Sequence, residues 1–276
     1  MQTKKTEKLT MDSNATNSNS STSSLKWCGY RWEHCMEGGR KIHPENPWMW
    51  YSSGCCRVDA DGVLRLKLEN RPSTVKYWNG VTYHPQIATG LVRSLEEFDY
   101  GTFSAEIMLP PGKNLWPSFW LTGSKHWPPE IDIMEAWSGD GSYFKWTTPQ
   151  FPWVNPSWRT TTNTHYNTID GNAFRKTDIG SKNISVLKQK LDPSENFVEY
   201  KCEWMPDSIK FYAGGKLVRT VSKKVSRELV ENINGDCDHR MDVVFNLFCE
   251  NPENFEVGLG SEMLVKNFKY NPADLG

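Results

Sequence analysis

The segment at residues 128–137, PPEIDIMEAW, carries three carboxylates within six positions, with apolar residues between them. Glu130 and Asp132 are two residues apart, and Glu135 follows three residues later. Residues i and i+2 of a β-strand share a face, so a regular strand would turn Glu135 away from the other two acids. One extra residue at Ile133–Met134, a β-bulge, would return it to their face. The spacing therefore predicts a bulged strand with three aligned acids.

Aligned carboxylates repel one another, so their alignment indicates a function. A retaining glycoside hydrolase needs two carboxyl groups about 5–5.5 Å apart, one as nucleophile and one as proton donor. Glu130 and Glu135 would be this pair, and the shorter Asp132 would hydrogen-bond the nucleophile between them. Crowded negative charge would also keep one Glu protonated near neutral pH, as a general acid requires. The spacing alone leaves two alternatives open: a calcium or magnesium site, and a solvated acidic edge strand.

Tryptophans frame the acidic segment and favour a sugar-binding site. Trp116 and Trp120 lie upstream, Trp127 precedes the acids, and Trp137 follows them. The chain has thirteen Trp, which a core does not easily bury because each indole N–H needs a partner. We expect about half of them in the core and the others along a surface, where aromatic faces contact the apolar C–H groups of sugars. A metal site would instead be surrounded by oxygen donors.

Composition excludes several classes of partner. Lys plus Arg is 32 and Asp plus Glu is 33, so no global basic field exists to bind nucleic acid. No apolar run approaches the roughly 20 residues that a membrane span needs, and residues 1–24 contain no apolar signal core. We expect a monomer with a polysaccharide substrate and without nucleic-acid or membrane partners. The compartment stays open, because extracellular action would need a removed signal or another route of release.

The local composition of the chain predicts one domain after a polar tail. Residues 1–24 are Ser, Asn, Thr and Lys, too polar to bury a core, and we expect them to be disordered. Residues 25–276 show short β-branched and aromatic runs separated by Gly, Pro, Asn and Asp, as an all-β sandwich or barrel does. The segment 222–234 is the one hint of a helix. The clearest expected strands lie within 62–70, 101–110, 197–221, 241–251 and 262–271.

The seven cysteines do not define a disulfide framework. Their odd number leaves at least one unpaired, and a domain of this size needs no cross-link. We expect mostly free thiols, with Cys28–Cys35 as the candidate disulfide. His34 and His43 lie close to these two cysteines in sequence, but the four residues fit no zinc motif well.

The segment EIDIMEAW resembles the signature of family 16 glycoside hydrolases, in the bulged Glu-x-Asp-x-x-Glu branch that holds laminarinases, agarases, porphyranases and carrageenases. Residues 90–123 resemble the family's Arg, Tyr-Gly and Trp-Pro-x-Phe-Trp approach to the active strand. Residues 199–218 resemble its Glu-Trp-x-Pro hairpin, and FNLF and MLVKNFKY match late strands. The similarity covers roughly residues 48–272.

This resemblance implies an all-β jelly-roll sandwich of two antiparallel, concanavalin-like sheets, with a substrate cleft across the concave sheet. It implies Glu130 as nucleophile, Asp132 as assisting acid and Glu135 as acid/base. It implies no catalytic cofactor or metal; many members carry a structural calcium on the convex side, whose ligands this sequence does not identify. The resemblance and the framing tryptophans give the expected substrate-binding residues as Arg93, Trp116, Trp120, Trp137, His165, Asn246 and Phe248.

Purely structural roles are open for three of these residues: an ion-paired strand residue for Arg93, a core residue for Phe248, and a satisfied sheet residue for His165. The aromatic segment 136–164 is expected to shape one side of the cleft. The stretch after residue 247 lacks the small, Gly-rich residues frequent in laminarinases, which weakens a direct assignment to β-1,3-glucan.

We therefore predict an endo-acting, retaining β-glycan hydrolase that cleaves a β-1,3-glucan or a marine-type galactan by double displacement. A transglycosylase with the same catalytic residues is one alternative. The others are a non-catalytic glycan-binding module and a metal-binding structural domain.

Overall fold

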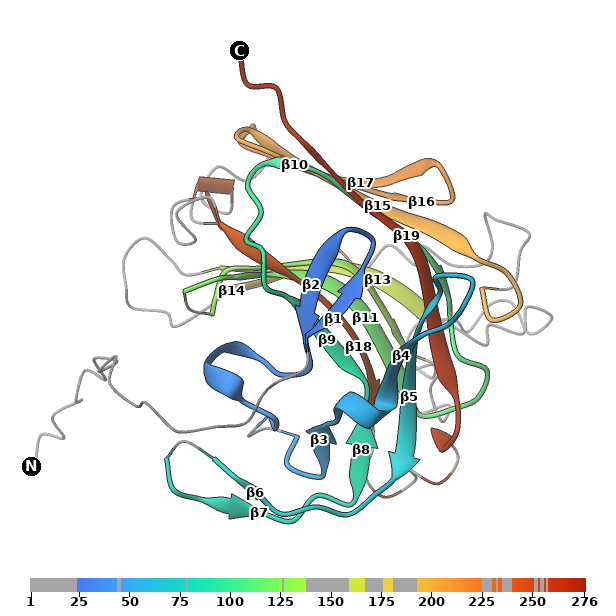
Figure 1. The fold of residues 1–276 in the computed structure, drawn as a ribbon. Coiled ribbons are helices and arrows are strands. Elements are labelled where there is room, and N and C mark those ends of the chain that lie inside the picture. Colours follow the sequence, from blue (N-terminus) through green and yellow to red (C-terminus); the bar gives the residue numbers. More distant parts are fainter. Residues whose placement is uncertain are drawn as a thin grey trace, which may run out of the picture.

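The chain folds into two packed β-sheets in the computed structural model (Figure 1). The structure describes residues 24–43, 46–77, 79–125, 127–137, 159–166, 176–180, 193–224, 230–231, 233–234, 240–250, 253, 256 and 258–276. Residues 1–23 and all of 138–158 lie outside these ranges, so the expectations of a disordered tail and of a cleft-shaping aromatic segment remain predictions.

Each sheet is built from strands far apart in sequence. The eight-stranded sheet has the order β1 (Leu25–Trp27), β2 (Tyr30–Glu33), β9 (Leu91–Ser94), β18 (Met241–Cys249), β11 (Leu115–Gly123), β12 (Glu130–Trp137), β13 (Arg159–Tyr166) and β14 (Lys176–Gly180). The nine-stranded sheet has the order β17 (Lys216–Ser222), β16 (Ser208–Ala213), β15 (Val198–Met205), β10 (Gly101–Met108), β19 (Glu262–Pro272), β5 (Leu64–Asn70), β8 (Ile87–Thr89) and β3 (Met49–Tyr51), with β4 (Cys56–Val58) paired to β5.

The predicted all-β jelly-roll sandwich is confirmed. Within the described residues, all strand pairs are antiparallel except β3 and β8, which run parallel at the edge of the nine-stranded sheet. A small separate hairpin pairs β6 (Val75–Lys76) with β7 (Thr82–Tyr83) and projects from the sandwich (Figure 1). Two single-turn 3-10 helices, η1 (Glu37–Gly39) and η2 (Ser53–Cys55), complete the elements.

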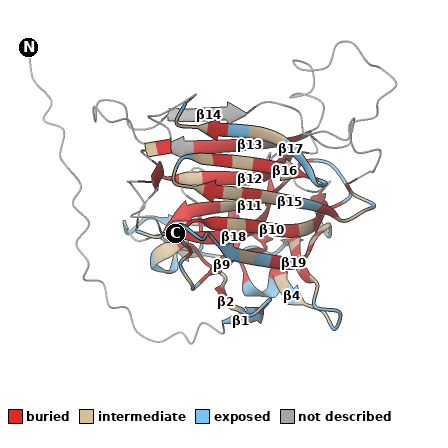
Figure 2. Cartoon of the chain, turned by 90° about the horizontal axis from the view of Figure 1, so that it is seen from above, coloured by how far each residue is buried: buried red, intermediate tan, exposed pale blue. Residues whose placement is uncertain are grey.

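Aromatic rings fill the space between the sheets. Phe119 and Phe245 stack with centroids 4.5 Å apart within the eight-stranded sheet. Phe268, from the opposite sheet, meets Phe245 edge-on at 5.8 Å. Seen from above, buried positions alternate with more exposed ones along β10, β15 and β16 (Figure 2). This alternation buries one face of each sheet, and each fully buried large side chain contributes roughly 1.5–3 kcal/mol of transfer free energy.

Three of the nine tryptophans with described side chains are core residues, namely Trp27, Trp32 and Trp204. The indole N–H of Trp204 donates to Oδ1 of Asn234 at 2.9 Å. Asn234 belongs to the expected helix of segment 222–234, of which residues 230–231 and 233–234 are helical, whereas Ser222 ends β17 and residues 223–224 form a turn. Val230 and Ile233 in this helix are buried. The other six described tryptophans, which include Trp116 and Trp120, are only partly buried or exposed.

The expectation of mostly free thiols is confirmed for the described residues, where all six cysteines are free, and the candidate disulfide between Cys28 and Cys35 is wrong. The two thiols face different surroundings. The Cys28 thiol interacts with the backbone of Asn267 and Phe268, whereas the Cys35 thiol donates to the Glu33 carboxylate at 3.3 Å. Burial raises the pKa of the Cys35 thiol to about 12, so it is protonated and unreactive at neutral pH.

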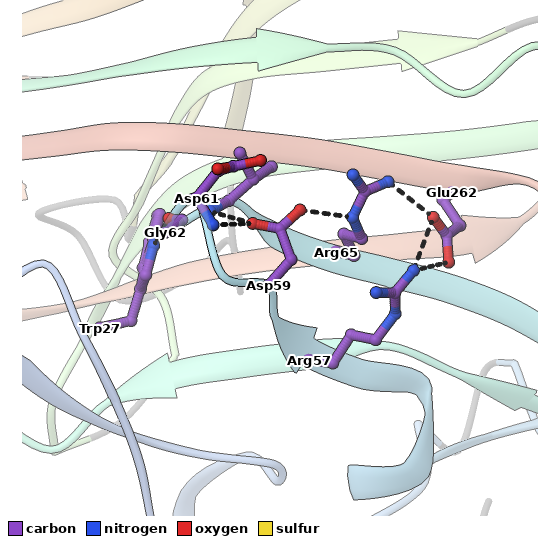
Figure 3. Close-up of polar contacts among 8 residues, drawn as sticks. Trp27, Arg57, Asp59, Asp61, Gly62, Arg65 and Glu262 are labelled. Carbon is purple, nitrogen blue, oxygen red and sulfur yellow. Dashed lines mark hydrogen bonds and ion pairs between the residues drawn. The ribbon is translucent and has the colours of Figure 1, made fainter.

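Charged residues at the turn before β5 form a closed network with β19 (Figure 3). The Asp59 carboxylate accepts hydrogen bonds from two backbone N–H groups and from Arg65. Glu262 accepts from both Arg57 and Arg65. These acids are already paired, so they do not offer the free oxygen ligands that a structural calcium requires.

No group of three or more His, Cys, Asp and Glu side chains that could hold a metal ion is found among the described residues, which include Cys28, His34, Cys35 and His43. In the same part of the chain, no helix has the length and hydropathy needed to cross a bilayer.

Candidate active site

The acidic segment forms β12, a central strand of the eight-stranded sheet, and the predicted bulge is present. On the β13 side, Asp132 pairs with Asn163 and Glu135 pairs with Thr161, so two residues of β12 stand opposite one residue of β13. On the β11 side, Ile133 is the residue without a partner in the register. Ile133 and its neighbour Met134 are buried in the core between the two sheets, and this packing holds the bulge in place.

The strand registers place the expected site residues on one face of the sheet, which points away from the nine-stranded sheet and is called the site face below. Across β12 and β11, Glu130 pairs with Thr122, Asp132 with Trp120, and Glu135 with Ser118. On β18, the residues that pair with this face of β11 also lie on the site face, namely Asp242, Val244, Asn246 and Phe248. The intervening residues Phe119, Leu121 and Phe245 point into the core.

Glu135 is held by two donors on neighbouring strands. The indole N–H of Trp116 donates to its Oε1 at 3.0 Å, and the amide of Asn163 donates to its Oε2. Only 7% of Glu135 is exposed. Both donors favour a carboxylate in a fixed orientation, and the burial strengthens their electrostatic effect.

Glu130 lies at the more open end of the acidic row. The indole N–H of Trp127 donates to its Oε2 at 2.7 Å. Trp127 itself is 39% exposed, so this donor lies at the rim of the site face. Glu130 also shares a hydrogen bond with the Asp132 carboxyl, which links the first two acids directly.

Asp132 is the most buried of the three acids, with 2% of its surface exposed. This burial raises the pKa of Asp132 well above its usual range, and the nearby Glu135 charge adds to the rise. The hydrogen bond with Glu130 and the positive charge of Arg219 act in the opposite direction without cancelling it. Asp132 therefore binds its proton more tightly than an exposed aspartate does.

The positive charge beneath the row comes from the opposite sheet. Arg219 lies on β17, and its Nη1 donates to the backbone oxygen of Thr162 at 2.9 Å. Thr162 is the β13 residue that faces the bulge. Arg219 also lies over the ring of Phe211, which orients its stem. Through Arg219, the nine-stranded sheet thus contacts β13, the strand that pairs with the acidic strand β12.

Arg93 is ion-paired on both sides. Its Nε and Nη2 donate to Oε1 of Glu33, and its Nη1 donates to Oδ2 of Asp242 at 2.8 Å. Glu33 comes from β2 and Asp242 from β18, so Arg93 on β9 bridges its two neighbouring strands. The guanidinium is directed along the sheet towards these acids.

The remaining expected substrate-binding residues lie in two groups. Trp120 donates through its indole N–H to Oδ1 of Asn246 at 2.7 Å. Trp116 stacks on Trp137 with centroids 5.9 Å apart and meets the edge of Phe248 at 6.0 Å. Phe248 is buried and also stacks on Tyr51, so it supports the aromatic row from below. His165 lies opposite Glu130 in the register, and its side chain is outside the described residues.

Four residues that contact these groups are not among the expected site residues, namely Glu33, Asn163, Arg219 and Asp242. Trp127 was expected beside the acids, and it donates to Glu130. The other four come from strands that join the site only through the sheet order, and nothing local in the sequence marks them.

A two-sheet sandwich with carboxylates aligned on a central strand is the arrangement expected of an enzyme that hydrolyses glycosidic bonds. The sequence model of glycosyl hydrolases family 16 matches residues 47–248. The chain therefore belongs to this family, and the resemblance noted from the acidic segment is confirmed.

Known relatives are similar in sequence over part of the chain. A beta-glucanase of Brevibacillus brevis is 26% identical over 183 residues, which cover 64% of this chain and 54% of the relative. The chain spans 15% to 54% of the length of the curated relatives that it matches.

Solved structures share the fold at low sequence identity. A Bacteroides ovatus family 16 protein of a mixed-linkage glucan locus, in complex with its G4G4G3G product, is 20% identical and has a TM-score of 0.59, with 81% of this chain and 88% of that chain covered. Porphyranase B of Zobellia galactanivorans is 16% identical with a TM-score of 0.59, with 87% and 85% covered. Equal structural similarity to a glucan-locus protein and a porphyranase means that the fold does not select the substrate.

Proposed function

We propose that the protein is an endo-acting, retaining β-glycan hydrolase with its catalytic centre at Glu130, Asp132 and Glu135. The observation that carries the proposal is the bulge in β12, which brings Glu135 onto the site face with the other two acids. The hydrogen bond between Glu130 and Asp132, and the electrostatic influence of Glu135 on Asp132, support a unit of three acids that act together.

In the first step, the Glu130 carboxylate attacks the anomeric carbon and the glycosidic C–O bond breaks. The electron pair goes to the leaving oxygen, which takes a proton from Glu135. In the second step, Glu135 accepts a proton from water, the water oxygen attacks the anomeric carbon, and the bond to Glu130 breaks. Asp132 orients Glu130 through the hydrogen bond that the two carboxyl groups share.

The two reacting carboxyl groups are each held by an indole donor. Trp127 and Trp116 each donate an indole N–H to one of the two reacting carboxyl groups, which holds both in position before substrate binds. The stacked pair of Trp116 and Trp137 offers aromatic surface beside Glu135, where a sugar ring can pack.

We propose a β-linked glucan or galactan as the substrate. The beta-glucanase and porphyranase similarities support this range and do not choose within it. A transglycosylase would use the same three acids with a sugar acceptor in place of water. Sizing of the products distinguishes the two, because transfer lengthens some chains whereas hydrolysis only shortens them.

Azide rescue of two truncated variants tests the roles. With an aryl β-glycoside of the preferred sugar, Glu130→Ala plus azide should yield the α-glycosyl azide, because azide replaces the nucleophile directly. Glu135→Ala should form the glycosyl-enzyme and yield the β-glycosyl azide. The same anomer from both variants, or undiminished turnover without azide, would contradict the assignment.

A further inference from the structure

The four central strands of the site face have an unbalanced charge. Strands β9, β18, β11 and β12 contain one basic residue, Arg93. The same strands contain four acids, which are Glu130, Asp132, Glu135 and Asp242. Glu33 on β2 adds a fifth acid beside Arg93. The basic residue of β2, Arg31, is ion-paired with Glu96. Substrate bound across these strands would therefore meet one cation already surrounded by carboxylates.

Arg93 does not present an open guanidinium fork. All three of its nitrogens are used, two on Glu33 and one on Asp242. The three side chains are 12%, 16% and 6% exposed for Arg93, Glu33 and Asp242 respectively, so water screens them little. Arginine binds a sulfate or carboxylate most strongly when its parallel N–H groups are free to face the anion. Here Glu33 already occupies that position.

Carboxylates outside the cluster add negative charge near Asp242. Burial raises the pKa of Asp242 to about 6, with Arg93 opposing the rise and Glu97, Glu33 and Glu37 adding to it. One cation thus acts on Asp242 against three further carboxylates. An anion brought close to the cluster would be repelled, and the low dielectric of a buried site increases that repulsion.

The cluster lies close enough to the acidic row to act on a bound chain. Asp242 pairs with Thr122 on β11, and Thr122 pairs with Glu130 on β12. Two strand spacings separate Asp242 from Glu130, which is about 10 Å between Cα atoms. A glycan that crosses the strands at Glu130 places a neighbouring sugar unit beside Asp242.

We propose that the Glu33–Arg93–Asp242 cluster makes the enzyme selective for uncharged glycan segments and excludes sulfated or uronate-bearing sugars from this part of the site. The inference rests on the proposed function and narrows its substrate class. Neutral hydroxyl groups can accept from or donate to the edges of the cluster, whereas a sugar with an added anion meets the net negative charge of Glu33 and Asp242, with Arg93 already ion-paired to both.

The test compares chains that differ only in charge. Laminarin, mixed-linkage glucan and agarose would each be assayed unmodified, partially sulfated, and O-methylated to the same degree, because methyl groups add bulk without charge. We expect kcat/KM on the sulfated chain to be lower by about tenfold or more than on the methylated chain, as repulsion by one unpaired charge at this range predicts. Raising the ionic strength from about 10 mM to 0.5 M should narrow the gap, because salt screens charge and not bulk.

Variants that neutralise one carboxylate test whether the cluster causes the discrimination against sulfated chains. Asp242→Asn and Glu33→Gln should each raise the ratio of sulfated to methylated cleavage several-fold, whereas Glu106→Gln, which removes a carboxylate from the nine-stranded sheet, should leave the ratio unchanged. Two independent variants guard against one that fails to fold. The inference would be overturned if the unaltered protein cleaved sulfated chains as fast as methylated chains or faster. It would also be overturned if the difference in kcat/KM between the two did not change with ionic strength. Cleavage of no chain in the panel would instead contradict the proposed function, and the inference would fall with it.

Discussion

The indole N–H of Trp116 donates a hydrogen bond of 3.0 Å to Oε1 of Glu135, and the same indole stacks on Trp137. One side chain therefore serves two surfaces: its edge orients a carboxylate and its face packs against a second aromatic ring. A sugar that packs against this pair would be positioned relative to Glu135 by the same side chain that fixes the carboxylate. Binding and protonation are thereby coupled through Trp116.

Trp116→Phe should separate these two contributions. Phenylalanine retains an aromatic face and loses the N–H, so we expect kcat to fall about tenfold with a smaller change in KM. The alkaline limb of the pH–rate profile should move to higher pH, because loss of a donor to the carboxylate favours its protonated form. Trp50→Phe removes an N–H bonded to the Arg71 carbonyl and serves as the matched control. Equal profiles for both variants would exclude the coupling.

Glu130→Gln should fold normally and lose turnover by about a thousandfold or more, since an amide cannot form the glycosyl-enzyme. The isosteric change keeps an acceptor for the Trp127 indole, so the midpoint of thermal unfolding should change little. Glu106→Gln, which alters a carboxylate paired with Lys266, controls for general effects of charge removal. Activity close to that of the unaltered protein would remove Glu130 from the mechanism.

Arg219→Met should weaken the site from the opposite sheet. Methionine keeps an unbranched stem over Phe211 and removes the donor to Thr162, the residue that faces the bulge. We expect a loss of about 1–2 kcal/mol in unfolding free energy, measured in urea, together with a several-fold fall in kcat. Arg57→Met removes a guanidinium that is 59% exposed and should change both quantities little. Identical behaviour of the two variants would contradict a link between Arg219 and the acidic strand.

Asp242 should make stability fall as pH rises. Its pKa is raised to about 6 in the folded protein, so the folded state binds this proton more tightly than the unfolded state, where the pKa is near 4. The stabilisation is fully present below about pH 4 and is lost as pH rises through about 6, by an amount on the order of 2–3 kcal/mol. Asp242→Asn should remove this component, so the difference between its unfolding free energy and that of the unaltered protein changes between pH 4 and pH 7. A difference independent of pH would show that the carboxyl titrates normally.

The offset of Glu135 by one position was enough to predict the bulge, because the period of a strand is two and a buried Glu between Ile131 and Ile133 would be costly. Alternation of apolar and polar residues likewise predicted strands such as β5 and β10. Local patterns of this kind reflect local backbone geometry, so they are readable from a short segment.

The partners of Arg93 could not be predicted in this way. Glu33 and Asp242 lie 60 and 149 positions away from it in the sequence, and they meet it only because β2, β9 and β18 are adjacent in the sheet. The candidate Cys28–Cys35 disulfide is wrong for a related reason, since proximity in sequence does not determine which way two thiols point. Sheet order and side-chain direction are global properties of the fold, and they decided both outcomes.

The indole hydrogen bonds of Trp127 and Trp116 also give the protein a built-in optical reporter. Each acceptor is one of the two carboxyl groups that exchange protons and charge in the proposed reaction, so the emission of these two indoles should respond directly when either group titrates or becomes covalently occupied. Because the chain has thirteen tryptophans, fluorotryptophan would be incorporated at position 116 or 127 alone, and reaction progress could then be followed without a labelled substrate.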